Sequence, residues 1–231
     1  MILRLHLFAD TNLIYQSQHH QSKRFLVGLT GIPGSGKTTL ADRLVKSIND
    51  QAGSNVSTII SLDGCRSALD MFEVIILDPA EAHRRRGAPF TFDSQAYCNY
   101  LEDLLNRSDP PPAPSFSHTL KDPVKDSIPI LPNNSIIILE GLYTLLDDGD
   151  VWRKASSLVH LGVLIETPIE IARQRLIQRH VLSGICKNLD QASSRADFND
   201  LPNGKFLMDH MRKPDLIVQS VQDNSMVLQC P

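Results

Sequence analysis

The segment Gly31 to Thr38, with the sequence GIPGSGKT, constrains the fold of this chain more than any other stretch. It matches the phosphate-binding loop signature, in which a glycine and four further residues precede Gly-Lys-Thr. The apolar run Phe25 to Thr30 comes before it, and Thr39 to Asn49 follows with apolar residues at helical spacing. The sequence therefore predicts a strand that leads into the loop and a helix that leaves it, the context in which this signature binds nucleotides.

The residue types of this loop suit an anion. Its glycines let backbone N–H groups curl around a phosphate, and the following helix points its positive end at the same place. Lys37 is expected to neutralise the β and γ phosphates, and the Thr38 hydroxyl to bind a bridging magnesium ion. The alternative is a glycine-rich turn that binds nothing. The predicted nucleotide-binding residues are Gly31, Gly34, Ser35, Gly36, Lys37, Thr38 and Thr39.

Composition and charge exclude several classes of protein. The chain has 231 residues, 42% of them hydrophobic, which is enough for an ordinary globular core. A net charge of -3 gives no general attraction to nucleic acid or to an acidic membrane, and no apolar run approaches the length of a membrane span. Four cysteines without metal spacing or close pairing indicate reduced thiols. We expect a soluble, cytoplasmic protein, and the sequence leaves its oligomeric state open.

Strands and helices alternate along the chain, which predicts the three-layer α/β class with a mainly parallel sheet and helices on both faces. One domain, 1–231, is expected, with an N-terminal extension at 1–24 and a substrate-side or lid insertion at about 84–132. Within that insertion, the proline-punctuated stretch Ser115–Pro132 resembles a hairpin. Further strands are expected at Val56–Leu62, Ile136–Leu139, Ser157–Glu166 and Asp215–Ser220. Further helices are expected at Asp78–Arg86 and Ser94–Leu105, and after Thr167-Pro168.

Two acids are expected to meet the phosphate loop. Asp63 and Glu140 each follow a predicted strand, and the carboxyl ends of parallel strands meet in one crevice. Phosphoryl transfer needs one carboxylate near the metal and another to accept the proton of the attacking hydroxyl. The plainer alternatives are a helix N-cap for Asp63 and a surface charge for Glu140. Arg175 and Arg179, four residues apart, either close over the phosphates or form the solvated face of a helix.

The order of the motifs GIPGSGKTTLADRL, SLDG, RRRGAPFTFD, PSFSHTLKDPV, ILEG and RLIQRH resembles the uridine kinase, phosphoribulokinase and pantothenate kinase superfamily. The resemblance spans roughly residues 25–218. It implies a P-loop kinase fold and an ATP-dependent small-molecule kinase with Mg²⁺. Asp63 then matches the catalytic base and Glu140 the acid near magnesium, while RLIQRH, with Arg175 and Arg179, resembles the arginine-bearing lid.

The resemblance also implies substrate contacts. TFDSQAY is similar to the uridine kinase segment in which an aspartate, here Asp93, holds ribose hydroxyls, and Phe116–His118 is similar to a segment that contacts the substrate through His118. On residue types alone, Asp93 is a helix cap and His118 a loop histidine. The chain departs from the pattern at Cys65-Arg66, where relatives commonly have an aromatic residue at the substrate site.

The first expected activity is therefore phosphorylation of uridine to UMP. A sugar, pantothenate or another small hydroxyl compound is the alternative acceptor. A nucleotide-dependent ATPase or regulator without an acceptor is the alternative of another class. The guanine-reading Asn-Lys-x-Asp motif is missing from the sequence, which argues against a GTPase switch. A degenerate kinase used as a scaffold is disfavoured because Lys37, Thr38 and both strand-end acids are intact.

Overall fold

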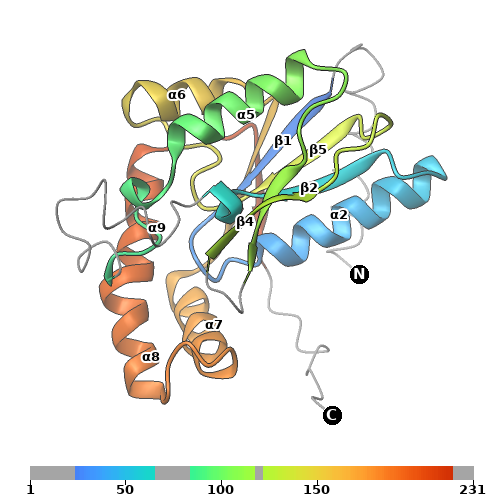
Figure 1. The fold of residues 1–231 in the computed structure, drawn as a ribbon. Helices are drawn as coiled ribbons and strands as arrows, with labels where there is room; N and C mark the ends of the chain where they lie inside the picture. Colours follow the sequence, from blue (N-terminus) through green and yellow to red (C-terminus); the bar gives the residue numbers. More distant parts are fainter. Residues whose placement is uncertain (1–23, 66–83, 118–121, 221–231) are drawn as a thin grey trace.

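A computed structural model describes residues 24–65, 84–117 and 122–220 of the chain. Its framework is a sheet in which neighbouring strands are parallel and follow the order β2-β5-β1-β6-β7 (Figure 1). The strands of this sheet are β1 (Phe25–Thr30), β2 (Ser57–Ser61), β5 (Ile136–Glu140), β6 (Leu161–Glu166) and β7 (Leu216–Gln219). The predicted α/β class with a mainly parallel sheet is confirmed.

Helices cover both faces of this sheet. Figure 1 places α2 on one side and α5 with α6 on the other, while α7, α8 and α9 lie together near one end. The α-helices are α2 (Lys37–Ala52), α5 (Ser94–Asn106), α6 (Gly149–Ser157), α7 (Ile169–Leu182), α8 (Leu189–Arg195) and α9 (Leu201–His210). The shorter helical turns are η1 (Leu62–Cys65), η2 (Pro89–Thr91) and the π-helical turn η3 (Ala196–Asp200).

The alternation of side chains along β1 and β5 divides the core into two layers. Leu26 and Ile137 point to the side where α5 and α6 pack, and Val27 and Ile138 point to the side of α2. All six residues of β1 are buried, as expected for a central parallel strand covered on both faces. The sheet therefore forms the middle layer of three, and the loop that follows β1 emerges at its carboxyl edge.

A separate antiparallel hairpin stands beside the end of β2. It consists of β3 (Ala113–Ser117) and β4 (Asp122–Ile128), so the predicted hairpin is confirmed. Its approach to η1 is very close, since a Cβ added at Gly64 would lie 2.4 Å from the Pro114 carbonyl oxygen. By contrast α5, also within 84–132, packs into the main core. The division into one domain with an extension at 1–24 stays a prediction, and residues 1–23 lie outside the described part.

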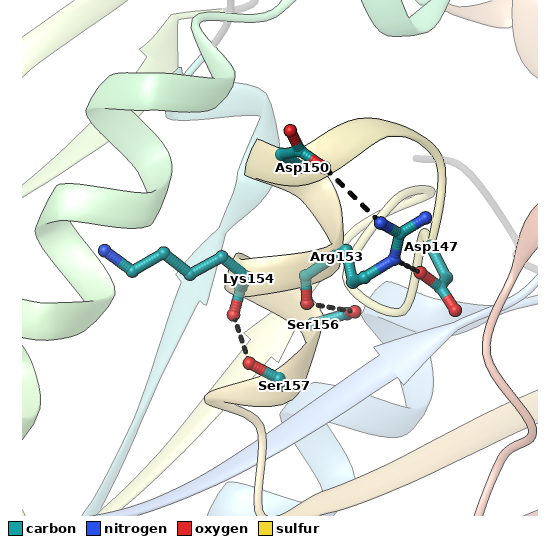
Figure 2. Close-up of polar contacts among 6 residues, drawn as sticks. All are labelled: Asp147, Asp150, Arg153, Lys154, Ser156 and Ser157. Carbon is teal, nitrogen blue, oxygen red and sulfur yellow. Dashed lines mark hydrogen bonds and ion pairs between the residues drawn. The ribbon is translucent and has the colours of Figure 1, made fainter.

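One predicted strand begins too early. The strand predicted at Ser157–Glu166 begins only at Leu161, because Ser157 is the last residue of α6, a helix the sequence patterns did not indicate. The hydroxyls of Ser156 and Ser157 donate to the carbonyls of Arg153 and Lys154 and so occupy acceptors in the last turn of the helix (Figure 2). Three residues then separate this helix from β6.

Charged side chains hold the start of α6 and join it to α5. Figure 2 shows the Arg153 guanidinium between Asp147, at 2.8 Å, and Asp150, at 3.4 Å. Lys154 Nζ reaches Glu102 of α5 at 2.7 Å. These exposed pairs contribute little energy each, and the burial of Trp152 and Ala155 between the layers does more to place the helix.

Other expectations fall partly or wholly outside the described residues. The helix predicted at Asp78–Arg86 lies mostly there, and residues 85–87 form a turn. Cys98 and Cys186 are buried free thiols, Cys230 lies outside the described residues, and the reduced state of the four cysteines stays a prediction. None of the helices in the described ranges is both long and apolar enough to cross a membrane.

Candidate active site

The phosphate loop connects β1 to α2 in a conformation that requires glycine. Gly34 has φ +84°, and a Cβ there would lie 2.5 Å from the carbonyl oxygen of Ala172 in α7. Gly31 has φ +151°, and a Cβ there would lie 2.6 Å from the carbonyl oxygen of Ile165 in β6. The loop backbone therefore lies directly against β6 and α7, in a left-handed conformation that L side chains rarely adopt.

The side chains of the loop are arranged around a site for an anion. Lys37 Nζ donates to the carbonyls of Gly31 at 2.9 Å and Ile32 at 3.2 Å, so its side chain folds back along the loop. Thr38 and Thr39 are exposed at the start of α2. Ser35 is buried, and its hydroxyl has no hydrogen-bond partner among the described residues. An unpaired buried hydroxyl inside a glycine-rich loop fits a phosphate group, which would supply the missing partner.

Glu140 lies at the carboxyl end of β5, beside Ser61 of β2 in the sheet register. It is 9% exposed, and its carboxylate makes side-chain hydrogen bonds with Thr38 and Ser61. Burial raises the pKa of Glu140, and the nearby Lys37 charge opposes that rise. The carboxyl end of β5 therefore lies beside the phosphate loop, and the role of Glu140 there stays a prediction.

Asp63 lies in η1, just after β2, and completes a group of charges around the loop lysine. Burial lowers the pKa of Lys37, the Arg179 charge acts in the same direction, and Glu140 and Asp63 oppose both. Asp63 also acts on the titration of Glu140, so the carboxylates lie within electrostatic reach of each other. Residues far apart in the sequence thus converge at the carboxyl edge of the sheet, as the strand-end rule predicts.

The arginines of α7 divide into two groups. Arg175 Nη1 donates to Ser220 Oγ at 2.9 Å and lies 3.4 Å from the Gly34 carbonyl oxygen, so it contacts the phosphate loop directly. Arg179 is exposed, and its charge reaches Lys37. Arg173 turns away and binds Asp197 at 2.6 Å. The structure therefore places Arg175 against the phosphate loop and Arg179 within electrostatic reach of Lys37.

The predicted substrate residues are less well defined. The Asp93 carboxylate accepts a hydrogen bond from the Ala96 N–H at 2.8 Å and caps α5, the role expected from residue type alone. His118 lies outside the described residues. The stretch before Asp93 is held by Tyr143, whose hydroxyl donates to the Gly87 carbonyl at 2.9 Å. Sequence reasoning missed Tyr143, although its position two residues after the glycine of ILEG could have indicated it.

Magnesium would find oxygen ligands here but no complete protein cage. In the described ranges, no group of three or more His, Cys, Asp or Glu side chains could hold a metal ion. Mg²⁺ usually keeps several waters and binds through one or two protein oxygens together with substrate phosphates. The Thr38 hydroxyl and the Glu140 carboxylate, already within hydrogen-bonding distance of each other, suit that partial role.

A phosphate-binding loop at the carboxyl edge of a parallel sheet, acids after two neighbouring strands and an arginine-bearing helix against the loop together define a P-loop kinase. The family model "Phosphoribulokinase / Uridine kinase family" matches residues 26–227, and the chain belongs to this family.

Relatives with curated names agree with the family. The Schizosaccharomyces pombe protein named "Putative uridine kinase C227.14" is 36% identical over 204 residues, which cover 88% of this chain and 86% of that protein. The Saccharomyces cerevisiae "ATP-dependent kinase YFH7" is 32% identical over 209 residues, 75% of this chain and 58% of its own length.

Solved structures agree with the fold. The crystal structure described as "putative fructose transport system kinase", from Silicibacter sp. TM1040, has a TM-score of 0.80 at 28% identity and covers 92% of this chain and 98% of its own. The crystal structure of YFH7 has a TM-score of 0.82 at 22% identity, with 94% of this chain and 99% of that one covered, and this likeness bears on the fold alone.

Proposed function

We propose that this chain is an ATP-dependent kinase that transfers the γ-phosphate to a hydroxyl of a small molecule, with uridine, converted to UMP, as the first candidate acceptor. One observation carries the proposal, namely the convergence of Lys37, Asp63 and Glu140 on a glycine loop suited to phosphate. A passive nucleotide carrier does not need a carboxylate poised to deprotonate an acceptor, and the choice between an alcohol and water as that acceptor is left to the experiment below. The name of the Schizosaccharomyces pombe relative supports uridine.

The roles follow from the charge that each group carries. Lys37 would exchange the Gly31 and Ile32 carbonyls for phosphate oxygens, since a charge-assisted bond to phosphate is stronger than one to a neutral carbonyl. Thr38 and Glu140 would hold Mg²⁺, which neutralises charge on the β and γ phosphates when bound. Arg175 and Arg179 would stabilise the charge on the transferred group from the side of α7.

Asp63 would accept the proton of the attacking hydroxyl. The acceptor oxygen forms a bond to the γ-phosphorus while the bond from that phosphorus to the β–γ bridging oxygen breaks, so ADP leaves with the bond's electron pair. Replacing Asp63 with Asn removes the proton acceptor and keeps the size of the side chain. We expect the variant to bind ATP and to transfer about 10² to 10⁴ times more slowly, a barrier increase of about 3 to 5 kcal/mol. Parallel loss of ATP binding would instead make Asp63 a metal-site or structural residue.

Acceptor identity is the finer part of the proposal. Asp93 uses one carboxylate oxygen for its cap, and the other oxygen of this exposed side chain would accept from ribose hydroxyls. His118 is the second proposed contact. A sugar is the second candidate, because a structure that matches nearly the whole chain is described as a "putative fructose transport system kinase".

The decisive experiment measures ADP release by purified protein with uridine, deoxyuridine, cytidine, fructose and pantothenate. We expect stimulation by uridine above deoxyuridine, because a missing hydroxyl leaves a carboxylate lone pair unpaired. If fructose strongly stimulates ADP release and no nucleoside does, the proposed acceptor changes from uridine to a sugar. ADP release that no acceptor stimulates, at equal rates in wild type and Asp63→Asn, would favour an ATPase.

A further inference from the structure

The π-helical turn η3 joins two walls of the site through neighbouring side chains. The Asn199 side-chain amide donates to the Arg86 carbonyl at 3.0 Å. The Asp200 carboxylate lies 2.6 Å from Nε2 of His180, near the end of α7. π-helical turns are rare in proteins, and those that do occur are often found at functional sites. One turn of the chain therefore touches both the segment 84–93, which precedes α5, and the arginine-bearing helix.

These bonds are held by buried side chains, His180 and Asn199, unlike the Arg173–Asp197 pair of the same turn. His180 is 3% exposed and Asn199 is 5% exposed, whereas Asp197 meets Arg173 in a solvent-exposed pair. An exposed ion pair is weak and tolerant of movement, but a buried polar group that loses its partner pays the full desolvation penalty. Nδ1 of His180 and Oδ1 of Asn199 have no partner among the described residues, so each side chain depends on a single bond to fix its position.

Each bond leads to a part of the candidate active site. His180 follows Arg179, whose charge reaches Lys37. Asp200 is followed at once by α9, which packs on the phosphate loop, since a Cβ at Gly204 would lie 3.1 Å from Ile32 and from Pro33. The His180–Asp200 bond thus ties the end of α7 to a helix seated on the loop.

Asn199 leads to the acceptor side. Arg86 adjoins Gly87, whose carbonyl accepts from the Tyr143 hydroxyl just beyond the end of β5. The segment is further braced by Thr91, whose hydroxyl donates to the Ala88 carbonyl at 2.7 Å. Asn199 therefore fastens the segment that ends in Asp93 to the same turn that holds α7.

We propose that Asn199 and the His180–Asp200 pair are positioning residues for phosphoryl transfer. Asn199 sets the acceptor-side segment 84–93, and the pair sets Arg179 over the phosphate loop, so that acceptor and phosphate are placed relative to each other through η3. This inference rests on the proposed kinase function. None of the three side chains contacts the reacting atoms in the proposal, because each acts through another residue.

Steady-state kinetics separate the two roles. Asn199→Ala is expected to raise KM for the acceptor about tenfold while KM for ATP changes less than twofold. Asp200→Ala is expected to lower kcat about tenfold, and Asp200→Asn to recover most of it, since an amide can still bond to the imidazole. Asp209→Ala, which breaks only an exposed pair with Lys205 on α9, is the matched control and should stay within twofold of wild type. Thermal unfolding of every variant checks that it is folded.

Hydrogen exchange tests the connection without any acceptor. A nonhydrolysable ATP analogue with Mg²⁺ should slow amide exchange at residues 87–92 of the wild type and of Asp209→Ala. Asn199→Ala should lose this protection at residues 87–92. The analogue should still slow amide exchange in α7 of that variant. No protection in the wild type, or unchanged protection in Asn199→Ala, would overturn the inference. If the wild type shows the protection and Asn199→Ala loses it, but no acceptor stimulates ADP release, the proposed function is rejected and the connection through η3 stands.

Discussion

Among the described residues, the loop lysine supplies a charge that no other group of the site can replace. Lys37 is partly buried and bonds to two loop carbonyls that a phosphate would displace. Lys37→Ala is expected to weaken ATP binding by at least tenfold and to abolish transfer, since a charge-assisted bond contributes about 1.5 to 3 kcal/mol. Isothermal titration and ADP release measure both effects. Lys46→Ala, at an exposed position of the same helix, is the control. Unchanged affinity and turnover in Lys37→Ala would refute the loop assignment.

Glu140 shows a conflict between stability and function. Burial raises its pKa, so the charged carboxylate is disfavoured in the folded protein without nucleotide. Glu140→Gln removes that charge, and we expect a higher melting temperature at pH 7 together with a loss of magnesium-dependent transfer. Thermal unfolding and ADP release at several Mg²⁺ concentrations measure the two changes.

The pH dependence of this effect has a definite sign. Because the folded pKa of Glu140 lies above its ordinary value of 4.5, the wild type gains stability as pH falls through that folded pKa and the group takes up a proton. The advantage of Glu140→Gln should therefore shrink between neutral pH and about pH 4.5. A variant that melts below the wild type at pH 7 would mean that attraction to Lys37 outweighs burial.

Residues that meet through strand ends could be predicted, and those that meet through the π-helical turn η3 could not. Asp63 and Glu140 follow recognisable strands, so the geometry of a parallel sheet was enough to bring them to Lys37. Asn199 bonds to Arg86 across 113 positions of sequence, from a segment that carries no motif. Nothing in residue type or spacing indicates that contact.

At the level of elements, the packing of α7 on the phosphate loop can be tested through glycine. Gly34→Ala and Gly53→Ala both place an alanine at positive φ, +84° and +64°, but only position 34 is crowded, by Ala172. Left-handed strain alone is about 1 to 2 kcal/mol, which we expect for Gly53→Ala. Gly34→Ala should cost more and should also weaken ATP binding, because α7 must move away. Urea unfolding and titration give the comparison, and equal losses in the two variants would contradict the close packing.

Elements with a clear local pattern could be predicted from the sequence, whereas an element that depends on tertiary contacts could not. β1 and β5 are continuous apolar runs, and α2 and α5 have apolar residues at helical spacing, so each was predicted within a few residues of its bounds. The sequence of α9 contains Pro202 and Gly204, which count as helix breakers. Proline is tolerated because it lies in the first turn, and glycine because Ile32 and Pro33 pack against it. Packing contacts of this kind cannot be deduced from the sequence before the fold is known.

For the whole molecule, the shared sheet predicts one cooperative unfolding transition. Trp152 is the only tryptophan in the sequence and reports the layer that contains α5 and α6. α2 lies in the opposite layer, yet both layers are built on alternate residues of the same strands. We expect Trp152 fluorescence and far-ultraviolet circular dichroism to give the same melting temperature, as the predicted single domain requires. Separate transitions would instead divide the chain into two folding units.

Nucleotide should then stabilise both layers together, although it binds at one edge. The phosphate loop touches β6, α7 and α9, so a ligand bound there favours the whole folded chain over the unfolded one. At one hundred times its Kd, a nonhydrolysable ATP analogue adds about 2.7 kcal/mol, which raises the melting temperature of a chain of this size by roughly 5 to 10 °C. Lys37→Ala should show a smaller shift at the same concentration and the full shift once the concentration is again one hundred times its weaker Kd. A shift seen by only one of the two probes would mean that nucleotide stabilises the loop and its neighbours without the rest of the sheet.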